Sequence, residues 1–127
     1  MEKQIIFSEQ APAAIGPYSQ AIRVGNLVFT SGQTPIDPTT GELISWEIRA
    51  QVQQVFKNIR AVLSAGGLTL DNVVKTTVFL AHMSDFGDMN ELYAQEFGEN
   101  RPARTTVEVA RLPKDCLVEI ETIAFAG

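Results

Sequence analysis

The sequence predicts an α+β fold in which two helices lie on one face of a mixed, mostly antiparallel sheet. Three observations support this prediction: two amphipathic helical segments, several short β-branched runs with a period of two, and their order along the chain. That order is three strands, a helix, a strand, a helix and two strands. A chain of 127 residues is expected to form one domain spanning residues 1–127, because single cores run to roughly 100–150 residues.

The N-terminal third alternates short strands with loops rich in glycine and proline. Its segments are a strand at 4–7, a loop at 11–18, strands at 21–24 and 27–33, and a loop at 35–41. The dipeptide Gly25-Asn26 separates the second and third strands, and a two-residue loop of this kind is typical of a β-hairpin. We therefore expect these two strands to be antiparallel neighbours.

Two segments have apolar side chains at steps of three and four, as amphipathic helices do. In the first, 46–65, these side chains are Ile48, Val52, Val55, Phe56, Ile59, Val62 and Leu63. Ser45 is the predicted N-cap of this helix, and the glycine pair after residue 65 is its predicted stop. The second helix is predicted to have Ser84 as its N-cap and to run through Phe97.

The remaining strands are expected at 73–80, 104–109 and 117–123. Strict alternation places Arg104, Thr106 and Glu108 on one face of their strand. It likewise separates Glu119 and Glu121 from the apolar residues of the last strand. The sheet also carries apolar residues on the face that two helices cannot cover, and self-association is the simplest way to bury them.

Composition and charge exclude several classes of protein. The net charge is −5 and the pI is near 4.8, whereas non-specific nucleic-acid binding requires basic patches. One cysteine, Cys116, and one histidine, His82, cannot form an intramolecular disulfide or a four-ligand zinc site. Apolar runs are far shorter than the roughly seven residues of a signal-peptide core or the roughly 18–20 of a membrane span. We expect a cytoplasmic protein that uses no metal and binds no membrane.

Arg104 and Glu119 admit two interpretations from their spacing. The more frequent one is a cross-strand ion pair on a solvated face, which contributes little to stability. The other is a site in which the Arg104 guanidinium holds a carboxylate through two hydrogen bonds and Glu119 acts as a general base. Strand parity alone does not decide whether the two side chains share a face.

Several blocks of the sequence, in this order, resemble one family over nearly the whole chain. They are APAAIGPYSQ at 11–20, Gly25-Asn26, TSGQ at 30–33, Asn90, PAR at 102–104, VEVARLP at 107–113 and VEIE at 118–121. The family is that of the reactive intermediate deaminases, or Rid proteins. The subfamily that the chain resembles is the enamine/imine deaminases, which act on 2-iminobutanoate and 2-iminopropanoate.

The resemblance implies a chorismate-mutase-like fold assembled as a homotrimer, with sites between subunits. It implies hydrolysis of reactive 2-imino and enamine acids to 2-keto acids and ammonia, a role in metabolite damage control, and no cofactor. By the same resemblance, Arg104 binds the substrate carboxylate and Glu119 positions water. The other implied pocket residues are Tyr18, Ser31, Gly32, Asn90 and Thr106. Thr106 stands where the family usually has cysteine, so its effect on activity and substrate preference is left open.

Two other functions remain open at this stage. A ligand-binding regulator could use the same cleft for 2-keto acids, and it would need Arg104 but not Glu119. A translation-inhibiting endoribonuclease is the second alternative, although the acidic pI, the absence of a basic stripe and the lack of a catalytic His or Lys cluster in the sequence argue against it.

Overall fold

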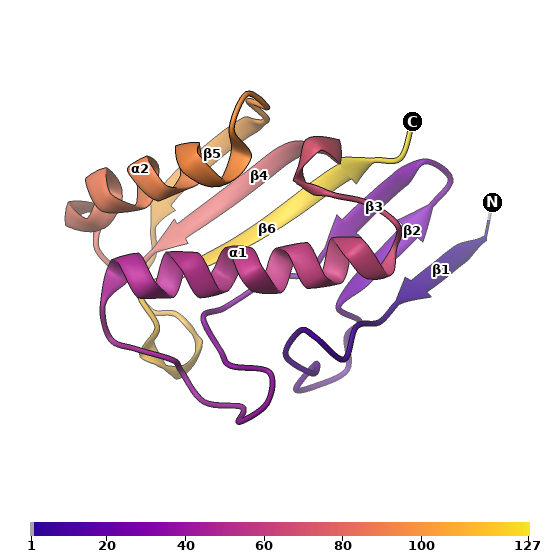
Figure 1. The fold of residues 1–127 in the computed structure, drawn as a ribbon. Helices are drawn as coiled ribbons and strands as arrows, with labels where there is room; N and C mark the ends of the chain where they lie inside the picture. Colours follow the sequence, from indigo (N-terminus) through magenta and orange to yellow (C-terminus); the bar gives the residue numbers. More distant parts are fainter. Residues whose placement is uncertain (1) are drawn as a thin grey trace.

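The computed structural model describes residues 2–127 and contains the expected order of strands and helices (Figure 1). The elements are β1 Lys3–Ile6, β2 Ala21–Val24, β3 Leu27–Thr30, α1 Ile48–Ala65, β4 Val73–Leu80, α2 Phe86–Phe97, β5 Ala103–Glu108 and β6 Val118–Phe125. Short 3₁₀ turns occupy Leu70–Asn72, Met83–Asp85 and Pro113–Asp115. The predicted α+β class is confirmed.

The six strands form one mixed sheet in the order β1-β2-β3-β6-β4-β5. Only β4 and β5 are parallel, and α2 makes the crossover connection that a parallel pair requires. The other pairs are antiparallel, including the predicted β2–β3 hairpin with Gly25 at φ 58°. The last strand, β6, inserts between β3 and β4 and therefore joins the two halves of the sheet.

Both helices pack on the same face of the sheet (Figure 1). Phe56 of α1 contacts Tyr93 and Phe97 of α2 with edge-to-face geometry, at ring-centroid distances of 5.8 and 5.5 Å. Beneath them, the sheet contributes fully buried aliphatic side chains such as Val78 and Ile120. Within residues 2–127, no helix has both the length and the apolar character that crossing a membrane demands.

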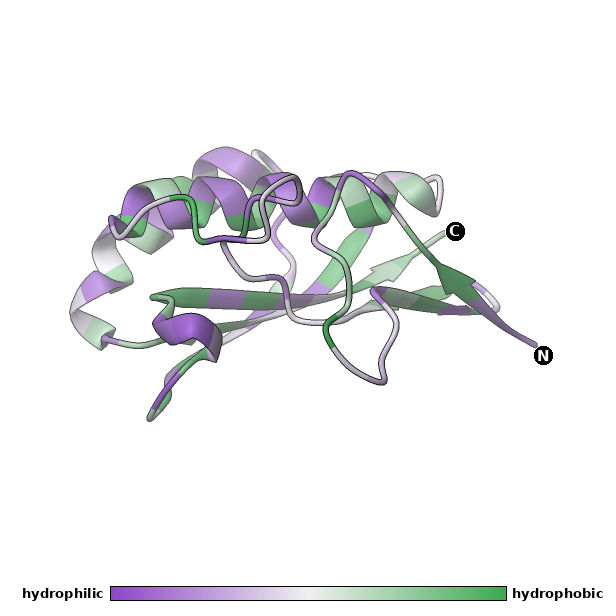
Figure 2. Cartoon of the chain, turned by 90° about the horizontal axis from the view of Figure 1, so that it is seen from below, coloured by the Kyte–Doolittle hydropathy of each residue, from purple (hydrophilic) through white to green (hydrophobic). Residues whose placement is uncertain are grey.

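Neither α1 nor α2 covers the opposite face of the sheet, since both lie on one side of it (Figure 2). Cross-strand pairing aligns Ile5, Ile22, Phe29 and Ile123 in one row across β1, β2, β3 and β6. Ile5 is 73% exposed and Phe29 is 42% exposed. The expectation of a second apolar face is therefore confirmed, and the row is an extended surface available for association.

Several predicted boundaries are wrong. α1 begins at Ile48, with Glu47 at the N-cap position and no side-chain cap. The Ser45 hydroxyl instead accepts a hydrogen bond from the Glu47 backbone N–H (3.0 Å), a local turn that competes with capping. Ser84 lies inside a 3₁₀ turn, and α2 starts after Asp85. Among the strands, β1 begins and ends one residue early, β3 stops three residues early, β5 begins and ends one residue early, and β6 continues to Phe125.

Candidate active site

The candidate residues fall into two groups that the sheet separates. Arg104 of β5 pairs with Thr76 of β4. The buried Thr76 hydroxyl is hydrogen-bonded to Tyr93 of α2, so Thr76 and Arg104 lie on the helix-covered face. Glu119 of β6 alternates with Val118 and Ile120, which are buried under the helices, so Glu119 lies on the other face. Since β4 also separates β5 from β6, the cross-strand ion pair is excluded. Within one chain, Arg104 and Glu119 do not meet.

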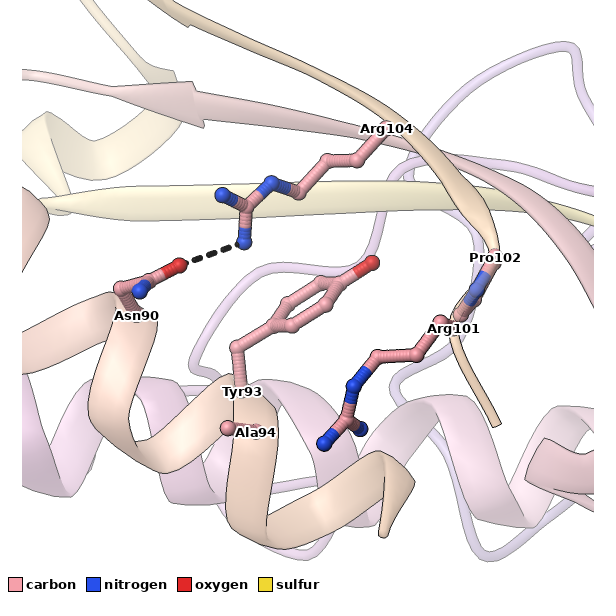
Figure 3. A pocket seen from close by; sticks show the side chains of 6 residues that line it. All are labelled: Asn90, Tyr93, Ala94, Arg101, Pro102 and Arg104. Carbon is pink, nitrogen blue, oxygen red and sulfur yellow. Dashed lines mark hydrogen bonds between the residues drawn. The ribbon is translucent and has the colours of Figure 1, made fainter. Parts of the chain in front are cut away.

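Arg104 lines a pocket of about 400 Å³ between β5 and α2 (Figure 3). Its Nη1 donates a hydrogen bond to Oδ1 of Asn90 at 2.8 Å. The guanidinium carbon lies 4.7 Å from the ring centroid of Tyr93 and 5.5 Å from that of Phe86. These contacts hold the guanidinium in one orientation through a hydrogen bond and two cation–π interactions.

Tyr93 is itself fixed in place. Its hydroxyl exchanges a 2.8 Å hydrogen bond with the buried Thr76 hydroxyl, and burial raises the pKa of the Tyr93 hydroxyl. Sequence reasoning treated Tyr93 and Phe86 only as apolar positions of the second helix and missed their contact with Arg104. The signal that could have found them is the spacing of Phe86, Asn90 and Tyr93, which places all three on one helix face.

The Arg104 guanidinium has no acidic partner among residues 2–127. The ion pairs of the described chain involve other arginines, namely Arg49, Arg60 and Arg111. Nε and Nη2 of Arg104 also make no hydrogen bond within residues 2–127. A guanidinium fork with free donors matches the geometry of a planar carboxylate.

Thr106 follows Arg104 on the same face of β5. Its Oγ1 is buried and has no hydrogen-bond partner within residues 2–127. Leaving a buried hydroxyl unpaired costs on the order of 1–3 kcal/mol, so such groups usually have a functional or solvent partner. Thr106 is therefore available to hydrogen-bond a group that comes from outside the chain.

Glu119 lies in a second pocket of about 520 Å³. Its lining residues are Ile15, Tyr18, Ser31, Gly32, Thr34, Ile36, Pro113, Lys114 and Glu119. The carboxylate packs against Gly32, where an added Cβ would lie 2.1 Å from Oε2 of Glu119. Burial, and secondly the charge of Glu121, raises the pKa of the Glu119 carboxyl. A raised pKa makes this carboxylate a stronger base than an ordinary glutamate.

Loops shape this second pocket, and hydrogen bonds from polar side chains hold the loops in place. The Ser31 hydroxyl donates to the Ser19 carbonyl at 2.6 Å, which leaves its oxygen free to accept a hydrogen bond. Asn58 of α1 donates to the carbonyls of Thr34 and Ile36 at 2.9 and 3.0 Å. These two hydrogen bonds attach the loop that forms one wall of the pocket to α1.

Sequence reasoning missed Lys114 as a wall of the Glu119 pocket. Lys114 and Asp115 adopt left-handed φ values of 56° and 57°, which cost energy for residues other than glycine. The bidentate Arg111–Asp115 pair, at 2.6 and 3.2 Å, stabilises this turn.

No cluster of three or more His, Cys, Asp and Glu side chains within residues 2–127 could hold a metal ion. Burial raises the pKa of the Cys116 thiol to about 11, as expected for a packing residue.

The chain is similar over nearly its whole length to proteins of one family. The family model described as Endoribonuclease L-PSP matches residues 8–126. A RutC family protein of Pyrococcus horikoshii is 57% identical over 123 residues, which cover 97% of this chain and 98% of that protein.

Two other relatives carry more specific descriptions. Reactive Intermediate Deaminase A, chloroplastic, of Arabidopsis thaliana is 47% identical over 124 residues, which cover 98% of this chain and 66% of that protein. The crystal structure of E. coli TdcF with bound serine superimposes with a TM-score of 0.94 at 43% identity, covering 98% of this chain and 99% of that chain.

Proposed function

Because the chain belongs to the endoribonuclease L-PSP family, which includes reactive intermediate deaminases, we propose that it hydrolyses 2-imino and enamine acids to 2-keto acids and ammonia. The family membership confirms the resemblance to Rid proteins. The proposed substrates are 2-iminobutanoate and 2-iminopropanoate, and the proposed reaction needs no cofactor. The one described cysteine, Cys116, is a free thiol, which agrees with a reducing compartment such as the cytoplasm.

One observation carries the proposal: the Arg104 guanidinium is held by Asn90 and Tyr93 but is not neutralised by any carboxylate of residues 2–127. A 2-imino acid supplies the planar carboxylate that such a fork binds. The serine bound to the similar E. coli protein also carries a carboxylate. The Thr106 hydroxyl, which has no partner in the described chain, is the proposed second donor to the bound acid.

The proposed reaction adds water across the C=N bond. Glu119 accepts a proton from water as the oxygen attacks the imine carbon and the C=N π electrons shift to nitrogen. Glu119 then returns this proton to the nitrogen and is regenerated as a carboxylate. The resulting carbinolamine then loses ammonia after its hydroxyl proton moves to nitrogen, and a 2-keto acid remains. Tyr18, Ser31 and Gly32 are proposed to line the substrate's path beside Glu119.

We propose that two copies of the chain complete one site. Arg104 and Glu119 lie on opposite faces of one sheet, so a substrate that contacts both needs the Arg104 pocket of one subunit and the Glu119 pocket of its neighbour. An interface that joins different faces of successive subunits forms a ring when its rotation closes, and we propose the three-membered ring of a homotrimer. The apolar row on the open face supports association, and a stable interface buries on the order of 800 Å² per partner.

Two other activities make different predictions. A regulator that only binds 2-keto acids does not need a proton-accepting Glu119 in its pocket. An endoribonuclease, as in the family description, needs cationic groups along an RNA path, whereas this chain has a net charge of −5. Imine hydrolysis uses both pockets and is the activity that the geometry supports best.

A coupled assay tests the proposed function. Threonine dehydratase acting on threonine generates 2-iminobutanoate, and its disappearance is followed with and without the protein. We expect the protein to accelerate imine loss above the spontaneous rate, and a Glu119→Gln variant to lose that acceleration. The proposal would be overturned if the wild-type protein left the rate of imine loss unchanged. It would also be overturned if the wild-type preparation cleaved RNA and the Glu119→Gln variant did not.

A further inference from the structure

The Arg104 pocket contains a second arginine. Arg101, which precedes β5, lines the same pocket, and the ring of Tyr93 lies between the two guanidinium groups in the close view (Figure 3). Nη1 of Arg101 donates to the carbonyl oxygens of Gly98 and Asn100, the latter at 3.2 Å. Its Nε and Nη2 make no hydrogen bond within residues 2–127.

Neither guanidinium in this pocket is neutralised by the described chain. Arg49, Arg60 and Arg111 each form ion pairs, but no ion pair within residues 2–127 includes Arg101 or Arg104. Both charges oppose the burial-driven rise in the pKa of the Tyr93 hydroxyl, so both act on the same small volume. Two guanidinium groups without an acidic partner in residues 2–127 give this pocket a local positive charge, although the net charge of the protein is −5.

We propose that this pocket selects 2-imino acids whose side chain ends in a second anionic group, with Arg104 holding the α-carboxylate and Arg101 the distal group. The proposal rests on the proposed function and specifies its substrate class. The favoured substrates are the imines of short acidic amino acids, whose distal carboxylate matches a guanidinium fork. Oxidation of an acidic amino acid at its α-carbon is the class of reaction that supplies such imines.

Arg101 also has a structural role, which the test must separate from its proposed role in ligand binding. Its Nη1 contacts lie just beyond the C-terminus of α2, where a cation interacts favourably with the helix dipole. Those contacts occupy one nitrogen, so the rest of the fork remains free for a ligand. A purely structural Arg101 would influence stability without influencing which ligands bind.

The experiment compares two stable 2-keto acids of equal chain length by titration calorimetry: 2-oxoglutarate, with two carboxylates, and 2-oxopentanoate, with one. We expect the assembled wild-type protein to bind 2-oxoglutarate at least about tenfold more tightly, as a charge-assisted hydrogen bond implies. Arg101→Gln should abolish most of this ratio. Lys57→Gln, which removes an exposed charge from α1 outside the pocket, should retain the ratio and controls for net charge.

The outcomes distinguish the possibilities. A wild-type ratio near one, or a ratio that Arg101→Gln leaves intact, overturns the proposal even if 2-iminobutanoate is hydrolysed. A lower melting temperature of Arg101→Gln with an unchanged ratio assigns Arg101 a structural role only and also overturns it. A parallel titration with phosphohydroxypyruvate identifies the distal group: tighter binding of this ligand than of 2-oxoglutarate, lost in Arg101→Gln, supports an anionic subsite that takes phosphate.

Discussion

The Arg104 and Glu119 pockets differ in construction and in charge. Regular elements build the first: β5 supplies the guanidinium, and one face of α2 supplies Asn90 and Tyr93. Loops build the second around a carboxylate on β6, with Gly32 pressed against it. The first pocket contains the guanidinium groups of Arg101 and Arg104 and no carboxylate, whereas the second contains the Glu119 carboxylate and is walled by Lys114. Each face of the sheet therefore carries half of the groups that the proposed imine hydrolysis would use.

The largest expected effect is in the Glu119 pocket. Glu119→Gln keeps the shape of the side chain but cannot accept a proton from water, so kcat on a 2-imino acid should fall by roughly 10²-fold or more. Calorimetry should show that 2-keto acids still bind, because the Arg104 pocket is intact. Turnover at the wild-type rate would mean that Glu119 has a structural role only.

The Arg104 pocket should respond differently, through binding as well as rate. Arg104→Lys retains the charge but loses the planar fork and its Asn90 contact. Loss of such a contact should cost on the order of 1.5–3 kcal/mol in kcat/KM, and 2-keto acid affinity should fall in parallel. Nearly full kcat/KM in this variant would exclude the carboxylate-binding role.

A change at Gly32 should sharpen the contrast by moving Glu119 without removing it. An alanine Cβ would lie 2.1 Å from Oε2 and 2.7 Å from Cδ of Glu119, so the carboxylate must shift. We expect kcat to fall by roughly tenfold in Gly32→Ala, since catalysis depends on sub-ångström positioning. Gly87→Ala is the matched control, because nothing lies within 4 Å of its added Cβ. Equal kcat values for the two variants would contradict the positioning of Glu119 by Gly32.

The smallest expected effect is on pH dependence. The pKa of Glu119 is raised, so the basic form, and with it activity, increases as the pH rises through that raised value. For the same reason, the contribution of Glu119 to the free energy of unfolding declines as the pH rises from its ordinary pKa to the raised one. Glu121→Gln removes the second cause of the shift and should move the acid limb of kcat/KM to lower pH. If the acid limb of the kcat/KM profile does not move, burial alone raises the pKa of Glu119.

The sequence predicts the fold more completely than the site. Alternation in β5 correctly groups Arg104 with Thr106, and helical periodicity locates α1 and α2, because both patterns are local. The insertion of β6 between β3 and β4 is a long-range pairing that leaves no periodic signal, so the separation of Arg104 from Glu119 required the structure. The Ser45 cap failed because its hydroxyl bonds within a local turn, and the Ser84 cap failed because Ser84 lies inside a 3₁₀ turn before α2.

Subunit mixing tests most directly whether the two pockets act together across an interface. Arg104→Ala and Glu119→Gln chains, each inactive alone, are co-expressed in equal amounts, and hydrolysis of 2-iminobutanoate is measured on the purified oligomer. In a ring with random assembly, about a quarter of the interfaces receive both intact residues, so about a quarter of wild-type activity should return. Activity no greater than that of either parent, in an oligomer shown by mass spectrometry to contain both chains, would contradict a site shared between subunits.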